Sequence, residues 1–306
     1  MDTKRFRNIA AGLAIVMAAG TLVACGSSPT RSEAPKTASE LAAQRAAVTA
    51  ALAKGAAAER SGDDDRAMLE YASALQIDPR SADIRVRIGG IYARSGDVAA
   101  ARTAYTDALT ANPNHADAHE GAGLILLRQQ HYDAARVHLQ RAISLNAAGR
   151  WRSHNGLGMM ADLTGDTKGA LTHYAVAVSQ QMGNAALRNN MGYSRYLAGQ
   201  YRMAETDYLA ALKLDRNYAL AWSNLALVRV RMGNAAGGVE AFAEAMKLPQ
   251  AYNNVGYLLY LQGSLDEAER YLQRAVAQSP SYYEIAQQNL ERVQVSLRDG
   301  RDSRDP

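Results

Sequence analysis

A turn centred on a small residue returns about every 34 residues through most of this chain. A fixed period of this length indicates one supersecondary unit stacked many times, because a single unit cannot bury its apolar face alone. The turns lie at Gly62, Gly96, Gln130, Gly165, Gly199, Gly233 and Gly263.

Small and bulky residues stand at fixed distances from each turn. Gly or Ala occurs seven residues before it, Ala or Gly five after it, and Ala twelve after it. The bulky residues nine after the turns are Tyr71, Tyr105, Leu139, Tyr174, Tyr208, Phe242 and Leu272. We expect the small residue of the first helix to face the first small residue of the second, so that two antiparallel helices lie close together. Pro79, Pro113 and Pro280 should end second helices, because proline lacks an amide donor.

This pattern resembles the tetratricopeptide repeat over about residues 48–282. The resemblance implies an all-α fold, a right-handed superhelix (α-solenoid) of about seven repeats over residues 41–297, closed by a capping helix near 283–297. Residues 298–306 are expected to be disordered. The expected repeats are 48–81, 82–115, 116–150, 151–184, 185–218, 219–248 and 249–282. Four residues are missing between Ala245 and Tyr252, which predicts a tightened junction at Leu248 and Pro249.

The first 24 residues have the pattern of a secretory signal peptide: a basic start, a short apolar run and a cleavage-type site. Cys25 is the only cysteine, which excludes an intrachain disulfide and a CxxC redox pair. The segment Leu22–Gly26 resembles a bacterial lipobox. That resemblance implies that Cys25 is lipidated, with palmitate among its acyl chains, and Gly26 after it implies the periplasmic face of an outer membrane. A retained membrane span and a plain secreted protein are the alternatives.

Residues 25–40 are rich in Ser, Pro and charge and predict a flexible tether behind the lipidated cysteine. Thr37 or Ser39 is expected to cap the helix that follows. The formal charge of +4 includes no basic run, so nucleic acid is not expected as a partner.

The first helices of repeats five to seven predict a protein-binding groove. Repeat positions 6, 9 and 12 share one helix face because they are three apart. A carboxamide can both donate to and accept from a peptide backbone, and aromatic side chains are typical of binding hot spots. The predicted groove residues are Asn190, Tyr193, Tyr196, Asn224, Leu227, Asn254, Tyr257 and Tyr260. The alternative is that the asparagines brace neighbouring helices and the tyrosines belong to the core.

Other polar residues give weaker patterns. His115 and His119 are four apart with no third ligand at helical spacing, so no metal site is predicted. Arg94, Arg128 and Arg231 could meet carboxylates, although a solvated face is the commoner reason for such residues. Trp222 and Tyr252 occupy a packing position. No nucleophile and base are patterned together, so we expect no enzyme activity, cofactor or small-molecule substrate.

The segment 251–293 resembles the TadD-type lipoproteins of Tad (Flp) pilus assembly through its YNN-GY opening and its SPSYY and NLERV ending. The resemblance implies a scaffold that helps to place or assemble an outer-membrane secretin or binds other pilus assembly proteins. Two alternatives stay open: a pilotin of a type IV pilus or type II secretion secretin, and a periplasmic adaptor for proteases or cell-wall hydrolases.

Overall fold

The computed structural model describes residues 37–279, 281 and 283–302. The signal peptide, Cys25, most of the tether, Pro280 and residues 303–306 lie outside the described residues. The chain divides into two units, residues 1–46 and 47–306. The described part of the first unit is the start of α2.

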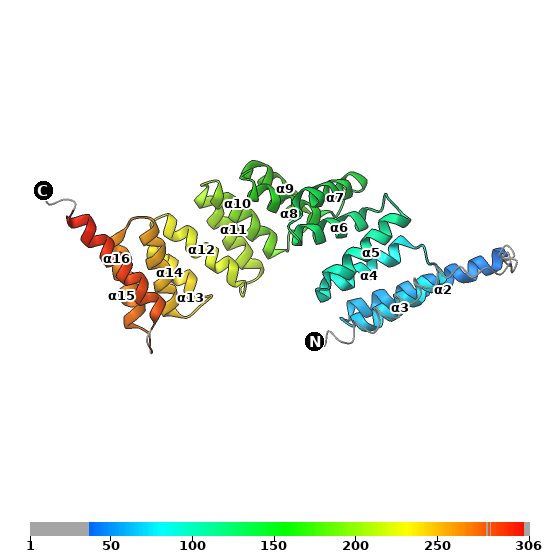
Figure 1. Cartoon of the computed structure of the whole chain (residues 1–306), viewed down its shortest axis with the longest axis horizontal. Coiled ribbons are helices and arrows are strands. Elements are labelled where there is room, and N and C mark those ends of the chain that lie inside the picture. The colour runs from blue at the N-terminus through cyan, green and yellow to red at the C-terminus, as the bar shows by residue number, and fades with distance from the viewer. Residues whose placement is uncertain (1–36, 280, 282, 303–306) are drawn as a thin grey trace, which may run out of the picture. The chain divides into compact units, whose positions relative to one another are not determined.

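The described residues form fifteen helices and no strand, which confirms the all-α prediction (Figure 1). They are α2 (Ala38–Arg60), α3 (Asp64–Ile77), α4 (Ala82–Ser95), α5 (Val98–Ala111), α6 (Ala116–Arg128), α7 (Tyr132–Leu145), α8 (Trp151–Leu163), α9 (Thr167–Gln180), α10 (Ala185–Leu197), α11 (Tyr201–Leu214), α12 (Ala219–Arg231), α13 (Ala235–Ala243), α14 (Leu248–Leu261), α15 (Leu265–Ala277) and α16 (Glu284–Asp302).

Each repeat contributes a first helix, here helix A, and a second helix, helix B. From α4 to α12, every helix A packs against the helix B that follows it and against the helix A of the next repeat, and α14 packs against α15 and α16. The helices A are α2, α4, α6, α8, α10, α12 and α14, and the helices B are the odd-numbered ones from α3 to α15. Repeats stacked in this way form the solenoid that the period predicted.

The turns between helices A and B have left-handed backbone at every predicted turn position. Gly96, for example, has φ 85° and ends α4. Gln130 fills the same slot in the third repeat with φ 62°, a conformation that costs a residue with a Cβ about 1–2 kcal/mol. Asp63 accepts a hydrogen bond from the Arg66 amide at the next helix start.

Close packing of helices A and B follows the small and bulky pattern, but the contact differs from the expected one. A Cβ added at Gly158 would lie 2.8 Å from Cε1 of Tyr174, so the glycine makes room for the bulky residue of helix B. We expected the first small residue of helix B to be the closest neighbour. A Cβ added at Gly256 would lie 3.2 Å from the backbone oxygen of Ala268, the first small residue of helix B. The Leu272 side chain would be closer still, at 2.6 Å.

The junction between repeats six and seven is tightened where the missing residues predicted. Helix α13 has 9 residues, against 14 in α11, and α14 begins at Leu248 with Pro249 in its first turn. The Lys247 amide donates to Oε1 of Gln250 at 3.2 Å and so satisfies one amide at the helix start.

Helix α16 covers the end of the last repeat, as the cap prediction required. It packs against α14 and α15, and its Ala286 and Val293 side chains are fully buried. The helix continues to Asp302, so the disorder expected from residue 298 is wrong for 298–302. Leu297 packs against the core, and no proline or glycine follows it before Gly300, so nothing ends the helix at 297.

Helix α2 begins at Ala38, inside the expected tether. Thr37 and Glu40 form a reciprocal cap: the Thr37 amide donates to Oε2 of Glu40 at 2.7 Å, and the Glu40 amide donates to Oγ1 of Thr37 at 3.3 Å. Thr37, one of the two expected capping residues, therefore starts the helix. None of the helices in the described part of the chain is long and apolar enough to cross a membrane.

Candidate functional site

The eight predicted groove residues lie on three neighbouring helices A, namely α10, α12 and α14. Tyr193 and Tyr257 are the most exposed, at 42% and 38%. The other six are half-buried. The alternative that places all the tyrosines in the core is therefore wrong for Tyr193 and Tyr257.

Asparagine side chains connect successive helices A by hydrogen bonds. Nδ2 of Asn224 on α12 donates to Oδ1 of Asn189 on α10 at 2.9 Å. Nδ2 of Asn189 faces Oδ1 of its neighbour Asn190 at 3.4 Å, and Nδ2 of Asn190 donates to Oδ1 of Asn155 on α8 at 2.9 Å. These contacts make one amide chain across α8, α10 and α12. Asn190 and Asn224 therefore brace neighbouring helices, as the alternative interpretation proposed.

A second amide chain joins α14 and α16. Nδ2 of Asn289 donates to Oδ1 of the buried Asn253 at 3.0 Å, and Nδ2 of Asn253 lies 3.3 Å from Oδ1 of Asn254. Nδ2 of Asn254 faces Sδ of Met246 at 3.2 Å. A thioether sulfur is a weak acceptor, so Asn254 has the weakest internal partner of the three predicted asparagines.

The two chains are separate because of one residue. Asn155, Asn189 and Asn253 stand at repeat position 5, where each accepts from an asparagine of the next stacked helix: α10, α12 and the capping helix α16. Repeat six has Ser223 there, and its hydroxyl donates to the Ala219 carbonyl within its own helix at 3.0 Å. Position 5 was not among the predicted site residues, although the 35-residue spacing from Asn155 to Asn190 and from Asn189 to Asn224 could have identified it.

Aromatic rings contact one another on α10 and α14, where Tyr196 and Tyr260 pack against the core and Tyr193 and Tyr257 reach solvent. The Tyr193 and Tyr196 rings are stacked with centroids 6.4 Å apart, and the Tyr196 and Tyr201 rings are 5.6 Å apart. Tyr257 and Tyr260 repeat the first arrangement at 6.3 Å. Rings at these separations form a stiff surface with a low entropy cost on binding.

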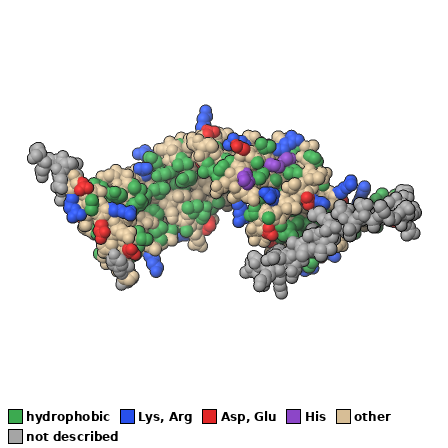
Figure 2. Space-filling view, viewed as in Figure 1, with side chains coloured by type: hydrophobic (Ala, Val, Ile, Leu, Met, Phe, Trp, Pro, Cys, Tyr) green, Lys and Arg blue, Asp and Glu red, His purple; other side chains and the backbone are tan. Residues whose placement is uncertain are grey.

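Exposed aliphatic side chains extend this aromatic surface and were missed by the sequence reasoning. Leu197 and Leu261, four residues after Tyr193 and Tyr257, are exposed, the latter at 61%. The same spacing occurs on α8, where Leu163 is 66% exposed. We call these six residues the apolar ridge: Met159, Leu163, Tyr193, Leu197, Tyr257 and Leu261. The i, i+4 spacing on one helix face was the available signal. Figure 2 shows hydrophobic side chains gathered over the region of α10 and α12.

Two carboxylates, the buried Asp207 and the half-buried Asp162, have donors on neighbouring helices. Asp207 on α11 pairs with Arg195 and Arg188 of α10. Burial raises the pKa of Asp207, and the two guanidinium groups oppose that shift. Asp162 accepts from the Ser194 hydroxyl at 2.8 Å and the Tyr174 hydroxyl at 3.0 Å. The contacts of Asp207 with α10 and of Tyr174 with Asp162 fix helix A to helix B, and the Ser194 contact fixes α10 to α8.

The remaining candidates are structural. Arg94 pairs with Glu59 at 2.9 Å and with Asp64 at 2.7 Å, so it is not simply solvated, whereas Arg128 and Arg231 are exposed. Nε1 of Trp222 donates to the Arg216 carbonyl at 2.8 Å, and the Tyr252 ring contacts Tyr271, as expected of packing residues.

The histidines do not pair as His115 with His119, the two that are four residues apart in the sequence. His115 contacts Asp83 through Nε2 at 2.9 Å, while His119 contacts His138. No group of three or more His, Cys, Asp or Glu side chains that could hold a metal occurs among residues 37–279, 281 and 283–302.

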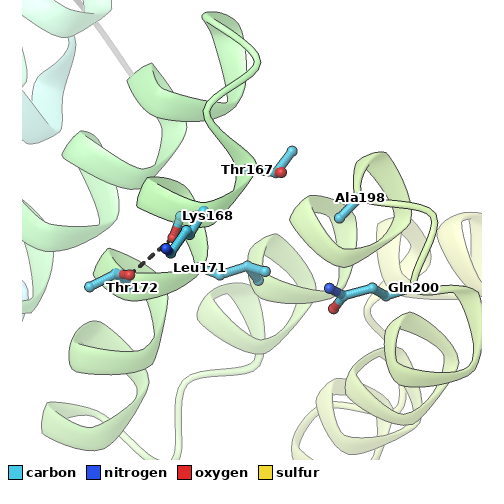
Figure 3. A pocket seen from close by; sticks show the side chains of 6 residues that line it. All are labelled: Thr167, Lys168, Leu171, Thr172, Ala198 and Gln200. Atoms are coloured by element: carbon cyan, nitrogen blue, oxygen red, sulfur yellow. Dashed lines mark hydrogen bonds between the residues drawn. The ribbon is translucent and has the colours of Figure 1, made fainter.

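Two surface hollows are open to solvent. One lies between α9 and the turn before α11 and is lined by Thr167, Lys168, Leu171, Thr172, Ala198 and Gln200 (Figure 3). The Thr172 hydroxyl donates to the Lys168 carbonyl at 3.0 Å. The other is lined by residues around Asn184 and Tyr218. A small molecule is normally enclosed over most of its surface, so these hollows do not indicate a small-molecule site.

Comparison with known families and structures identifies the repeats. Models of the tetratricopeptide repeat match residues 87–149, 122–185 and 249–282. No curated protein matches the chain in sequence.

Solved structures share the fold. A chain of the APC/C hetero-tetramer Cut9–Hcn1 aligns at a TM-score of 0.57 and 17% identity over 78% of this chain and 48% of that one, so the match spans about half of the Cut9–Hcn1 chain. The Pseudomonas aeruginosa protein PilF aligns at 0.53 and 16% identity over 72% of this chain and 98% of its own. A tetratricopeptide repeat protein from Parabacteroides merdae aligns at 0.52 and 14% identity over 81% and 99%. Identities this low show the fold alone.

Proposed function

We propose that this chain, whose helices form a solenoid of tetratricopeptide repeats, is a scaffold that binds an extended segment of a partner protein on the helix-A face of repeats four to seven. The observation that carries the proposal is the apolar ridge. Its side chains are exposed on α8, α10 and α14, beside amides that can bind a backbone.

The ridge supplies binding free energy. A leucine or methionine side chain that becomes fully buried contributes about 1.5–3 kcal/mol, and the tyrosines add rigid contact area. Tyr193 and Leu197 lie one helical turn apart, as do Tyr257 and Leu261, so each pair offers one continuous apolar contact to a partner side chain.

Hydrogen bonding to the partner backbone falls mainly to Asn254. Asn190 and Asn224 already donate to other amides, whereas Asn254 donates to a sulfur. Exchanging that contact for a peptide carbonyl would replace a weak acceptor by a strong one. No hydrogen bond among the described residues uses Oδ1 of Asn224, so this atom can accept from a partner amide.

The proposed setting is the periplasmic face of an outer membrane. Cys25 would carry the lipid, the residues after it would connect lipid and solenoid, and the partner would be an outer-membrane secretin or another protein of Tad (Flp) pilus assembly. The resemblance of residues 251–293 to the TadD-type lipoproteins supports this choice. A pilotin role and an adaptor for proteases or cell-wall hydrolases remain the alternative functions, and the likeness to PilF does not choose among them.

Capture of the partner from cells tests the proposal. The full chain is crosslinked in its native membrane, purified and analysed for bound proteins, in parallel with a Tyr193→Ala, Tyr257→Ala variant. A Leu209→Ala variant is the matched control, because Leu209 is 44% exposed but lies on helix B of repeat five.

A secretin or pilus protein that is captured by wild type and control but lost from the ridge variant is the expected result. Recovery of a protease or hydrolase in its place would overturn the pilus assignment. Equal capture by all three proteins would overturn the binding surface itself.

A further inference from the structure

Two histidine pairs connect helix A to helix B in consecutive repeats. Nδ1 of His119 on α6 lies 3.0 Å from Nδ1 of His138 on α7. In the next repeat, Nδ1 of His154 on α8 lies 3.1 Å from Nδ1 of His173 on α9. The ring planes are inclined by 44° and 46°, so the two pairs have nearly the same geometry.

In each pair, a side chain at repeat position 4 of helix A contacts the side chain 19 residues later, on helix B. The same place holds the ion pair Arg188–Asp207 in repeat five and the ring contact Tyr252–Tyr271 in repeat seven. Packing alone therefore does not require histidine there. The four imidazoles are half-buried, so ions and water can reach them.

The hydrogen bonds of the first pair determine its tautomers. Nε2 of His119 lies 3.0 Å from the Pro113 carbonyl oxygen, which can only accept, so Nε2 carries a proton. In the neutral ring Nδ1 of His119 then has a lone pair, and His138 must donate from its own Nδ1. A histidine held by a backbone carbonyl through one nitrogen, with the other nitrogen unprotonated, is the arrangement found in metal-binding histidines.

The ligand separation restricts the metal. With metal–nitrogen distances of about 2.0–2.1 Å, nitrogens 3.0–3.1 Å apart subtend about 95° at the metal. This angle suits two adjacent ligands of a square-planar or octahedral ion, which for nitrogen ligands favours Cu²⁺ or Ni²⁺ over tetrahedral Zn²⁺. Directing both lone pairs to one point requires a rotation about χ2, which has a broad energy minimum in histidine.

The charges near the pairs are compatible with a cation. Burial lowers the pKa of His138, His154 and His173, and the mutual charge of the paired rings lowers it further for His138 and His154. The carboxylate of Asp166, which acts on His173, adds negative potential at the second pair.

We propose that each histidine pair binds one divalent ion of the Cu²⁺ or Ni²⁺ type through its two Nδ1 atoms, with water in the remaining coordination positions. The ion takes the place of the shared proton. The proton on Nδ1 of His138 moves to Nε2 through solvent, so both rings stay neutral. Bound ions would tie helix A to helix B in repeats three and four.

Nickel titration by calorimetry at pH 7.5 on the untagged full chain tests the proposal. Wild type is compared with His138→Gln, with His173→Gln and with the double variant. His131→Gln is the matched control, since His131 is exposed and has no side-chain capping bond. Each pair variant should lose one bound Ni²⁺ per chain, the double variant should lose two, and the control should lose none.

An unchanged number of bound ions in the pair variants, or an equal loss in the control, would overturn the proposal. Melting curves without metal show whether each variant folds. If one pair variant does not fold, the number of Ni²⁺ ions bound by the other pair variant still tests the proposal. Copper EPR spectra supply a second readout, because ligation by a pair should give hyperfine coupling to two nitrogens, and coupling to fewer would contradict it.

Discussion

The carboxamide of Asn224 donates to that of Asn189, 35 residues earlier in the chain, at 2.9 Å. Asn189 is buried and in turn faces Asn190, which donates to Asn155 on α8. A buried amide in the middle of such a chain satisfies partners on both sides, so its removal leaves polar groups without partners.

Asn189→Ala should therefore lower the free energy of unfolding by about 1–3 kcal/mol. Asn254→Ala should lower it by less, about 1 kcal/mol, because Asn254 donates only to a sulfur and accepts only the long 3.3 Å contact from Nδ2 of Asn253. Urea unfolding of both variants checks this. An equal loss in the two would contradict the distinction between a bracing amide and an available one.

This distinction changes how the groove should be mutated. Replacing Asn190, Asn224 and Asn254 together would remove interhelix hydrogen bonds as well as groove amides, so lost binding could reflect lost structure. The exposed ridge residues are the better choice, because Tyr193 and Tyr257 have side chains that reach solvent.

Neighbouring glycines in α4 should respond in opposite ways to alanine. A Cβ at Gly89 would lie 2.9 Å from the Tyr105 ring, so Gly89→Ala should cost about 1–3 kcal/mol of stability. At Gly90 the nearest atom is Nη1 of Arg94 at 3.7 Å, and Gly90→Ala should stabilise the helix by about 0.5–1 kcal/mol. Thermal unfolding measures both, and destabilisation of similar size at the two positions would show that packing against Tyr105 is not the cause.

The sequence predicted the helix order, the turns and the cap because a 34-residue period fixes the packing of each unit against the next. It predicted Gln130 at a turn position, and the structure gives that residue the left-handed backbone of the glycines. It did not predict the amide chains, because they depend on which side chain of the preceding helix is close enough to accept. The histidine pairs were missed because the sequence was searched for histidines four residues apart on one helix. The two histidines of each pair are 19 residues apart and lie on different helices.

Stability should fall as the pH decreases below neutral. His138, His154 and His173 have pKa values lowered from the ordinary 6.5, chiefly by burial, so the unfolded chain binds more protons than the folded one just below that pH. The stabilising contribution is complete above about pH 6.5 and decreases as the pH falls toward the folded pKa values.

The measurement is urea unfolding between pH 7.5 and 5 in wild type and in a His138→Gln, His173→Gln variant. The variant should lose less stability over this range, because it lacks two of the three imidazoles whose pKa is lowered by burial. The same pH slope in both proteins would assign the effect to other groups.

Cys25→Ser should release the protein from the membrane. A serine hydroxyl cannot form the thioether to the lipid, and in the proposed lipoprotein the acyl chains would supply the anchoring free energy. Palmitate labelling should vanish and the protein should move from the membrane to the soluble fraction. Retention in the membrane without label would instead favour an uncleaved apolar segment as the anchor.

Site-specific photocrosslinking tests the binding surface most directly. A photoreactive amino acid is placed at Tyr257 on the ridge in one protein and at Leu209 on helix B in another, two positions of similar exposure. If the helix-A face of repeats four to seven binds the partner, irradiation of cells should give an adduct from position 257 and none from position 209. Adducts from position 209 alone would show that the partner binds the opposite helices and would contradict the account.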